Sequence, residues 1–490
     1  MSRMKTLICL AVASTLQALP GVSSAQAPAD PSRGAVLDAV RKAVSSNPDV
    51  QARWHGYQAA TSAQDVARGG YLPRVDLNAS AGHRWRKDPH EEKDDWNYSG
   101  AALELNQMIY DGFATSGEVS RMGYTRLVRY YELLDASENT GLEVIRAYGD
   151  VERQRQLVEH AKANYVAHKQ IYDQISNRTT AGVSRAVDRD QAQGRLALSE
   201  SNLLTEISNL HDVSSRYQRL VGELPVDQLP PLADSLADVQ LPANVVAALS
   251  TAYVSNPAFN AAIENVRANL AQRDVARSAY HPKLSLHAST GVNHNINNDD
   301  SDSGLKGNRR ESLVELLFSF NIFRGGSDQA RVHQAGKEVD QARDLREKAC
   351  RDLRQTLTIA YQDTHSLAEK LGYLETYQAA AAKTREAYRR QFDIGQRTLL
   401  DLLDSENEYF DARRAYTNAR YDLLVAQART LAGTGQLLHA LGVVREDLPA
   451  AKDAGQNRDT VDPADMCPAD APAPLEVNKS ALLTSEPSYR

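Results

Sequence analysis

The sequence predicts a mixed fold in which very long helices are combined with four β-strands by an internal tandem repeat. The stretch DVARGGYLPRVDLNASAG, which begins at Asp65, is nearly repeated by DVARSAYHPKLSLHASTG from Asp274, 209 residues later. In both copies the apolar period changes after a proline, from that of a helix to that of a strand. A proline-free run from about 115 to 178 follows the first pair of strands. One unit of helix, β-hairpin and long helix is therefore predicted to occur twice.

The N-terminus carries the features of an export signal. Arg3 and Lys5 precede an apolar run over 7–19, and the small residues VSSAQA follow. This order predicts a secretory signal peptide over 1–25, because the apolar run is too short to span a bilayer. We expect an exported protein of a Gram-negative envelope. The net charge of −7 offers no basic footprint, so a nucleic-acid partner is not expected.

Each repeat begins with a helix that an Asn-Pro pair interrupts. Asn47-Pro48 in repeat 1 (26–225) corresponds to Asn256-Pro257 in repeat 2 (244–448). Proline is tolerated in the first turn of a helix but not in its interior. Each pair is therefore predicted to end one helix and to start the next.

Two segments lie outside the repeated pattern. Prolines cluster over 226–243, which we interpret as a linker in the equatorial region. The segment 449–490 is rich in alanine, aspartate and proline and has no periodicity, so it is predicted to be a disordered tail. Cys467 falls in this tail and Cys350 in a charge-rich helical segment, so no disulfide framework is expected.

The strands are predicted from alternation of apolar and polar side chains. In the first strand Val75 and Leu77 alternate with Asp76 and Asn78. A strand with two unlike faces is typical of this period-two pattern. The same pattern recurs in three further segments, which begin near 101, 284 and 314 and of which the last extends to Ile322. Each repeat is thus predicted to contain one β-hairpin.

A very long helix is predicted to follow each hairpin. The run from about 115 to 178 would extend roughly 95 Å at about 1.5 Å per residue. Its apolar residues step by alternating threes and fours, which indicates a coiled-coil seam. Gly182 and Gly395 then punctuate the two copies, and a return helix follows each of them.

Four strands per chain are too few to close a membrane barrel, since known spanning barrels begin at eight. An open sheet edge cannot lie in hydrocarbon, because its backbone N–H and C=O groups would be unpaired. If these strands span a bilayer, several chains must therefore share one barrel. The alternative is a soluble sheet on its own core, but the long helices could not cover such a sheet.

This tandem organisation, with an Asn-Pro pair in each copy, resembles the TolC family of outer-membrane factors over about 35–443. The resemblance implies a homotrimer in which a 12-strand β-barrel in the cell outer membrane continues into a periplasmic tunnel of twelve helices. It also implies a periplasmic adaptor protein and an inner-membrane ABC transporter as partners. The turn QMIYDGFATSGEV resembles the branch that serves type I protein secretion.

Three functions are compatible with these patterns. The first is the outer-membrane channel of a type I secretion system, and the second is a multidrug efflux duct of the same fold. The third is a periplasmic coiled-coil scaffold that has no pore. We find no nucleophile elbow and no phosphate loop, so no enzymatic activity and no cofactor are expected. The acidic loop Asn297–Gly304 lacks the spacing of an EF-hand, so no metal site is expected.

The stretch FDIGQRTLLDLLDSEN, from Phe392 to Asn407, resembles the periplasmic entrance of the family. Asp401 and Asp404 are spaced i and i+3, so they lie on one helix face. In a trimer they would place six carboxylates around the axis, where like charges raise some pKa values and attract cations. An ordinary solvated helix face is the alternative.

The family resemblance further implies a closed-state latch. Arg397 and Asp188 match the latch positions, whereas Phe392 occupies the aromatic position without a hydroxyl group. The latch is therefore expected to be weak or to rest on the first two residues alone. Gly182 and Gly395 mark the two hairpin tips that the adaptor would contact, and glycine is also expected there because it ends helices.

Overall fold

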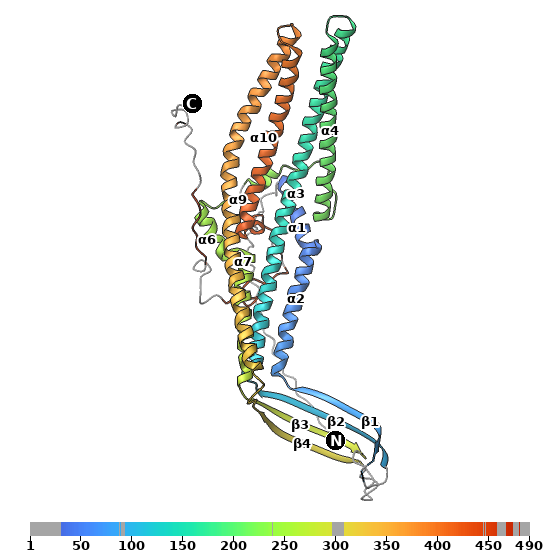
Figure 1. The fold of residues 1–490 in the computed structure, drawn as a ribbon, viewed down its shortest axis with the longest axis vertical. Coiled ribbons are helices and arrows are strands. Elements are labelled where there is room, and N and C mark those ends of the chain that lie inside the picture. The colour runs from blue at the N-terminus through green and yellow to red at the C-terminus, as the bar shows by residue number, and fades with distance from the viewer. Residues whose placement is uncertain are drawn as a thin grey trace, which may run out of the picture.

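The computed structural model describes residues 31–87, 89, 94–237, 239–295, 308–443, 445, 447–457, 467–473 and 480. The predicted signal peptide and the acidic loop Asn297–Gly304 lie outside these residues. Figure 1 shows an elongated molecule, with helices along its length and a curved sheet that bends away at one end.

Helices account for most of the described chain. They are α1 (Pro31–Ser46), α2 (Pro48–Arg68), α3 (Ala114–Thr180), α4 (Ala186–Val221), α5 (Leu232–Leu236), α6 (Val245–Ser255), α7 (Pro257–Arg277), α9 (Ser327–Asp393), α10 (Leu399–Thr434) and α11 (Leu437–Ala440). The strands are β1 (Arg74–Arg86), β2 (Asp94–Tyr110), β3 (Lys283–His294) and β4 (Arg309–Ser319).

The predicted tandem repeat is confirmed by the order of these elements. The series α2, β1, β2, α3, α4 is followed by α7, β3, β4, α9, α10. The two long helices have 67 residues each, and the two return helices have 36 residues each. At about 1.5 Å per residue each long helix extends about 100 Å.

Both Asn-Pro pairs separate two helices, as predicted. Asn47 caps α2 by accepting a hydrogen bond from the Asp49 backbone N–H, and Asn256 caps α7 by accepting one from the Phe259 N–H. The prolines occupy the first turn of their helices, where no backbone donor is lost. At each Asn-Pro pair one helix thus ends, and the asparagine caps the N-terminus of the next helix.

The four strands form one antiparallel sheet in the order β1-β2-β3-β4. The pairing of β2 with β3 joins the two repeats, with Leu103 opposite Thr290. Strand β4 was expected to extend to Ile322, but it ends at Ser319. The reason is that Ser319 pairs with Lys283, where β3 begins, so no partner remains for the later residues.

The helices form a wall whose order changes along the molecule (Figure 1). Near the sheet the neighbours run α2, α3, α7, α9, whereas near the far end they run α4, α3, α10, α9. The largest apolar cluster lies between these halves and includes the fully buried Tyr148 and Leu232. The Tyr148 hydroxyl donates to the Pro230 carbonyl, so the segment predicted as an equatorial linker is held against α3.

The prediction of a disordered tail from 449 is wrong for the parts of it that the structure describes. Residues 449–457 lie against α3, where the Tyr130 hydroxyl donates to the Pro449 carbonyl at 2.9 Å and Arg126 donates to the Ala454 carbonyl at 2.7 Å. Ala454 is buried in the same contact. The segment contains no long helix or strand, which is why its sequence has no periodicity. Side chains of α3 donate hydrogen bonds to two of its backbone carbonyls and hold it in place.

The expectation that the two mature cysteines are unpaired is also wrong. Cys350 on α9 and Cys467 form a disulfide whose Cα atoms lie 5.9 Å apart. Beside it the Tyr253 hydroxyl donates to the Pro468 carbonyl, and Arg354 pairs with Asp470 at 2.6 Å. Residues 449–457 thus lie against α3, whereas residues 467–473 lie against α9 and are bonded to it covalently.

We expect Cys467→Ser to lower the thermal unfolding midpoint of the oxidised protein. A bond that closes a loop of 117 residues removes entropy from the unfolded chain worth about 4 to 5 kcal/mol in the loop-entropy model. Calorimetry with and without reductant measures the effect, and reductant should not shift the variant further. Equal midpoints for the oxidised parent and the variant would contradict this role of the bond.

Candidate functional site

One face of the sheet is apolar and exposed. On this face Leu77 is paired with Leu103, and both are exposed in the single chain. On β4 the side chains of Val314, Leu316 and Phe318 are 74%, 62% and 69% exposed. A soluble protein rarely exposes so continuous an apolar surface, so this face indicates contact with lipid or with a partner.

The opposite face of the sheet carries polar side chains on β1, β2 and β3, although β4 also places Leu313 and Leu317 there. Asp76 is paired with Glu104 there, and His287 lies opposite Glu315. The side chain of His287 shares a hydrogen bond of 2.9 Å with Asn106 on β2. Apolar residues on one face and polar residues on the other are typical of a membrane barrel that surrounds water.

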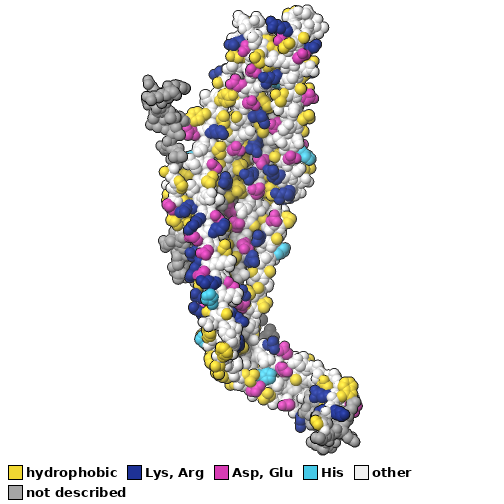
Figure 2. All heavy atoms as spheres, viewed as in Figure 1, with side chains coloured by type: hydrophobic (Ala, Val, Ile, Leu, Met, Phe, Trp, Pro, Cys, Tyr) yellow, Lys and Arg dark blue, Asp and Glu magenta, His cyan; other side chains and the backbone are white. Residues whose placement is uncertain are grey.

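Large hydrophobic side chains mark both ends of the apolar face. Figure 2 shows hydrophobic side chains gathered at the bend between helices and sheet. Around this bend Phe113, Tyr280 and Phe323 are 66%, 51% and 81% exposed, and at the other end of the sheet Trp85 is 65% exposed. Aromatic residues at both boundaries are typical of membrane–water interfaces.

The two edge strands, β1 and β4, each have backbone N–H and C=O groups along one side with no neighbouring strand in the described sheet. In the described sheet β1 pairs with β2 alone, and β4 pairs with β3 alone. Unpaired backbone groups in hydrocarbon cost several kcal/mol each, so further strands must complete the sheet. As for the helices, none in the described part of the chain is long and apolar enough to cross a membrane.

At the far end of the molecule, each long helix turns into its return helix through the same glycine geometry. Gly182 and Gly395 both have φ +74°, and open space surrounds the position of a Cβ at each. Glycine is therefore favoured at these two positions because of the positive φ of the backbone, and not because a side chain would clash with its neighbours. Around these turns Val183 is 77% and Ile394 is 69% exposed, so each tip presents an aliphatic side chain to its surroundings.

An apolar cluster joins the two hairpins just behind their tips. Its members come from both hairpins and are Ile171, Ile175, Ala192, Phe392, Leu399, Leu402 and Leu403. Phe392 is 6% exposed, and the Arg178 guanidinium lies 5.4 Å from the centre of its ring. The structure thus places Phe392 in the apolar core of the tip, and its part in a latch stays a prediction.

Asp401 caps the helix on which it lies. The Thr398 hydroxyl donates to its carboxylate at 2.8 Å, and the Asp401 backbone N–H donates back to that hydroxyl. The Thr398 backbone N–H also donates to the Asp401 carboxylate, at 3.2 Å, and the two hydrogen bonds that this carboxylate accepts, with a smaller contribution from Arg397, lower the pKa of Asp401. Within one chain the pKa of Asp401 is thus set by its own helix cap, and the effect of six acids around a trimer axis stays a prediction.

Asp404 is paired across the two hairpins. Its carboxylate accepts a hydrogen bond of 2.8 Å from Arg195 on α4, while 55% of its side chain stays exposed. Sequence reasoning missed Arg195, because nothing in the pattern of α4 indicates a partner 209 residues away. The structure thus brings one predicted entrance residue to a cation that the sequence did not reveal.

The predicted pair of Arg397 with Asp188 is not made within the described chain. Arg397 donates to the Gln391 side chain at 3.0 Å and lies over the Tyr388 ring at 4.3 Å. Asp188 instead accepts from the Arg185 backbone N–H in the capping box of α4. Both residues nevertheless lie at the tips, within a few residues of Gly182 and Gly395.

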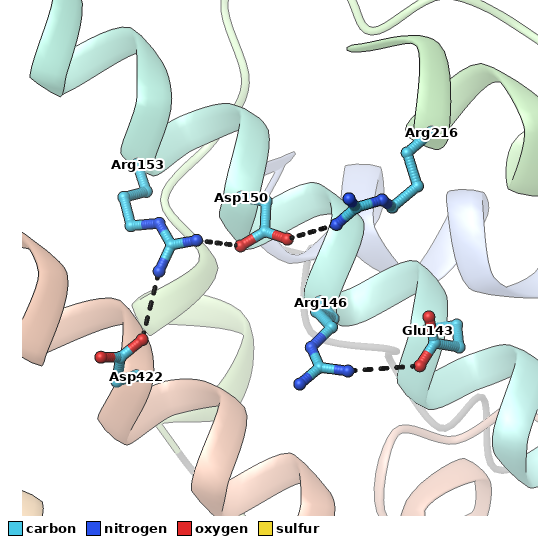
Figure 3. A network of polar contacts seen from close by, with 6 residues as sticks. All are labelled: Glu143, Arg146, Asp150, Arg153, Arg216 and Asp422. Atoms are coloured by element: carbon cyan, nitrogen blue, oxygen red, sulfur yellow. Dashed lines mark hydrogen bonds and ion pairs between the residues drawn. The ribbon is translucent and has the colours of Figure 1, made fainter. Parts of the chain in front are cut away.

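Behind the tips, four polar pairs join α3 to α10, and we call this contact the polar seam. The pairs are Arg153–Asp422 at 3.1 Å, Gln156–Tyr421 at 2.8 Å, His160–Thr417 at 3.1 Å and His168–Asn407 at 3.2 Å. At its lower end Arg153 also donates to Asp150, which accepts from Arg216 on α4 (Figure 3). Burial is the main cause of the raised pKa of Asp150.

Comparison with known proteins agrees with this geometry. The model of the family described as "Outer membrane efflux protein" matches residues 39–223 and 248–436. The chain is 25% identical over 409 residues to the outer membrane efflux protein BepC of Brucella suis, which covers 81% of this chain and 85% of that protein. It is 26% identical over 472 residues to the alkaline protease secretion protein AprF of Pseudomonas aeruginosa, covering 91% of this chain and 94% of that protein.

A solved structure shows the same fold. The CmeC outer membrane channel of Campylobacter jejuni superposes with a TM-score of 0.73 at 15% sequence identity. The match covers 85% of this chain and 88% of the channel. Both the long helices and the four-stranded sheet therefore belong to a known channel architecture.

We expect Gly395→Ala to loosen the tip of the second hairpin. A non-glycine residue in the left-handed region costs about 1 to 2 kcal/mol, so the free energy that keeps this turn closed should fall by about that amount. Hydrogen exchange of the turn amides measures this change. Gly336→Ala in α9 is the matched control, since it meets open space at ordinary helical φ and should stabilise its helix. Equal exchange at the turn in parent and Gly395→Ala would contradict the assignment.

Proposed function

Because the chain belongs to the outer membrane efflux protein family, we propose that it is the outer-membrane channel of a type I protein-secretion system. The family and the fold establish an outer-membrane channel that extends into the periplasm. The observation that favours protein secretion is the nearly end-to-end match to the alkaline protease secretion protein. Efflux of small molecules is the second candidate, since BepC is named for efflux and is similarly identical over a shorter stretch.

The proposal includes a homotrimer and two docking partners. Three sheets of four strands complete a twelve-strand barrel, which removes the open edges of β1 and β4. The hairpin tips at Gly182 and Gly395 are proposed to contact a periplasmic adaptor, which in turn engages an inner-membrane ABC transporter. The exposed Val183 and Ile394 support this role, because exposed aliphatic side chains at a rigid turn favour a protein contact.

A secretion assay tests the proposal. In a host without its own channel, the chain is expressed together with a type I transporter, its adaptor and a repeat-protein cargo. We expect the cargo in the medium, whereas paired Val183→Asp and Ile394→Asp changes should retain it in the cell without loss of assembly. Paired Gln362→Asp and Ser366→Asp changes in α9, far from the tips, are the control. Extrusion of small dyes without export of any protein cargo would favour the second candidate.

We further propose that Asp401 and Asp404 line the narrow periplasmic entrance. Three chains would supply six carboxylates, and a ring of acids attracts multivalent cations. Arg195 moderates this ring, because it neutralises Asp404 within each chain. The latch of Arg397 with Asp188 is kept as a proposal for contact between chains, since each residue has other partners within one chain.

Block of the channel by trivalent cations tests the entrance. Asp401→Ala combined with Asp404→Ala should abolish block from the periplasmic side in single-channel recordings. Arg195→Gln should strengthen block, because it frees the Asp404 carboxylate, and it should cost about 1 kcal/mol or less since the pair is partly exposed. Arg189→Gln, which removes a neighbouring exposed arginine, is the matched control. Unchanged block in the double alanine variant would place the acids away from the pore.

A further inference from the structure

One half-buried and one fully buried histidine, His160 and His168, lie in the polar seam, and the entrance proposed above does not use them. His168 is 1% exposed, and its Nε2–H donates to the Asn407 Oδ1 atom of α10 at 3.2 Å. His160 shares a hydrogen bond of 3.1 Å between its Nε2 atom and the Thr417 hydroxyl. The two side chains lie eight residues apart on α3, so both face the same helix of the second hairpin.

The second nitrogen of each ring is buried without a partner. The Nδ1 atoms of His160 and His168 both lack a hydrogen-bond partner in the described structure. When Nε2 carries a proton, a second proton at Nδ1 would therefore create a charge whose N–H group has no acceptor in the described structure. Such a group costs free energy as long as α3 and α10 remain packed.

The charges around His160 do not compensate such a proton. A cavity of about 20 Å³ beside the ring is lined by His160, Ala163, Asn164, Arg385, Glu406, Tyr409, Phe410 and Arg413. The carboxylate of Glu406 on α10 is engaged by Arg385 on α9 at 3.6 Å. Arg413 on α10 opposes a charge on His160, whereas Glu159 on its own helix favours one weakly. The two arginines and the two glutamates sum to zero, so no surplus negative charge is left for a protonated His160.

The charges around His168 also supply no surplus negative charge. Arg195 of α4 opposes a charge on His168, and the carboxylate of Asp404 already pairs with that arginine. The uncharged amide of Asn407 is the group of α10 that the ring contacts. The second histidine thus also has no free carboxylate within the seam.

We propose that the polar seam is a pH-sensitive closure, in which protonation of His160 and His168 separates α10 from α3 and opens the periplasmic half of the channel. Separation would expose both rings to water, where a positive charge is solvated. While α3 and α10 are packed together, the polar seam accommodates the two imidazole rings in their neutral form and disfavours the protonated form. The consequence for conduction rests on the proposed channel function, whereas the separation of the helices does not.

The direction of the effect follows from the pKa values. Burial, followed by Arg413, lowers the pKa of His160 from 6.5 to about 4, and burial lowers the pKa of His168 as well. The separated seam therefore binds more protons than the packed seam once the pH falls below about 6.5. For each histidine the ratio of separated to packed seam rises up to about tenfold per pH unit. For His160 this window closes near pH 4, and above about pH 6.5 the seam keeps its full stability.

Spin-label distances across the seam test the proposal directly. Labels at cysteines introduced for the exposed Val166 on α3 and Asp411 on α10 report separation, with labelled chains diluted by unlabelled ones in the full assembly. Between pH 7.5 and 4.5 we expect the separated fraction to rise at least tenfold. His160→Gln combined with His168→Gln should hold the rise below about twofold. His211→Gln, an exposed histidine of α4, should behave like the parent.

A second variant covers failure of the double change to fold. Asn407→Asp places a carboxylate against His168 and should suppress the acid-induced separation, because the protonated ring then gains a partner. A separated fraction that stays constant with pH in the parent, or that still rises in the double variant, would overturn the proposal. Conductance is recorded in parallel: absence of conductance at every pH would count against the channel function, while the distances would still decide the seam.

Discussion

The open edges of the four-stranded sheet are the constraint on which the rest of the structure depends. Strands β1 and β4 each have one partner within the chain, and one face of the sheet is apolar and exposed. Because backbone groups cannot remain unpaired in hydrocarbon, the chain needs neighbours that continue the sheet. The helices must then also complete a closed wall, since α3 and α9 continue directly from the sheet into the periplasmic part (Figure 1).

The tandem repeat explains how one chain supplies a regular share of that wall. Each repeat delivers one β-hairpin and one long helical hairpin, and the two copies differ little in element length. The repeats meet at the pairing of β2 with β3 and at the contacts of α3 with α7 and α10. The segment around α5 and the disulfide-linked C-terminal segment then tie the copies together at mid-length.

The features that sequence reasoning predicted are those set by local chemistry. The helix starts at Pro48 and Pro257 follow from the shape of proline, and the turns at Gly182 and Gly395 follow from a backbone that requires positive φ. The sheet follows from period-two alternation, and its membership in a shared barrel follows from counting strands. Such features need no knowledge of which distant residues meet.

The features that it missed depend on distant contacts. The pair of Arg195 with Asp404 and the bond of Cys350 with Cys467 join residues far apart in the chain, so no local period records them. Phe392 was assigned from its place in a matched motif, and the motif did not reveal that its side chain is packed in the apolar core of the tip. Motif position fixes where a residue lies along a helix, but the face that it presents depends on the packing of all four helices.

The distribution of buried groups along the wall shows where it can change shape. At mid-length the core is apolar and includes Tyr148 and Leu249 among its fully buried side chains, so separation of helices there would expose large apolar areas. Between mid-length and the tips, α3 meets α10 through the hydrogen bonds and the ion pair of the polar seam, and the apolar cluster behind the tips adds Ile171 and Ile175 to this contact. Water can replace the polar partners when the helices part, so separation along the polar seam costs less than separation at mid-length. The same chain thus combines an apolar equator with the polar seam that we propose as a closure, so the seam could part while the equator stays packed.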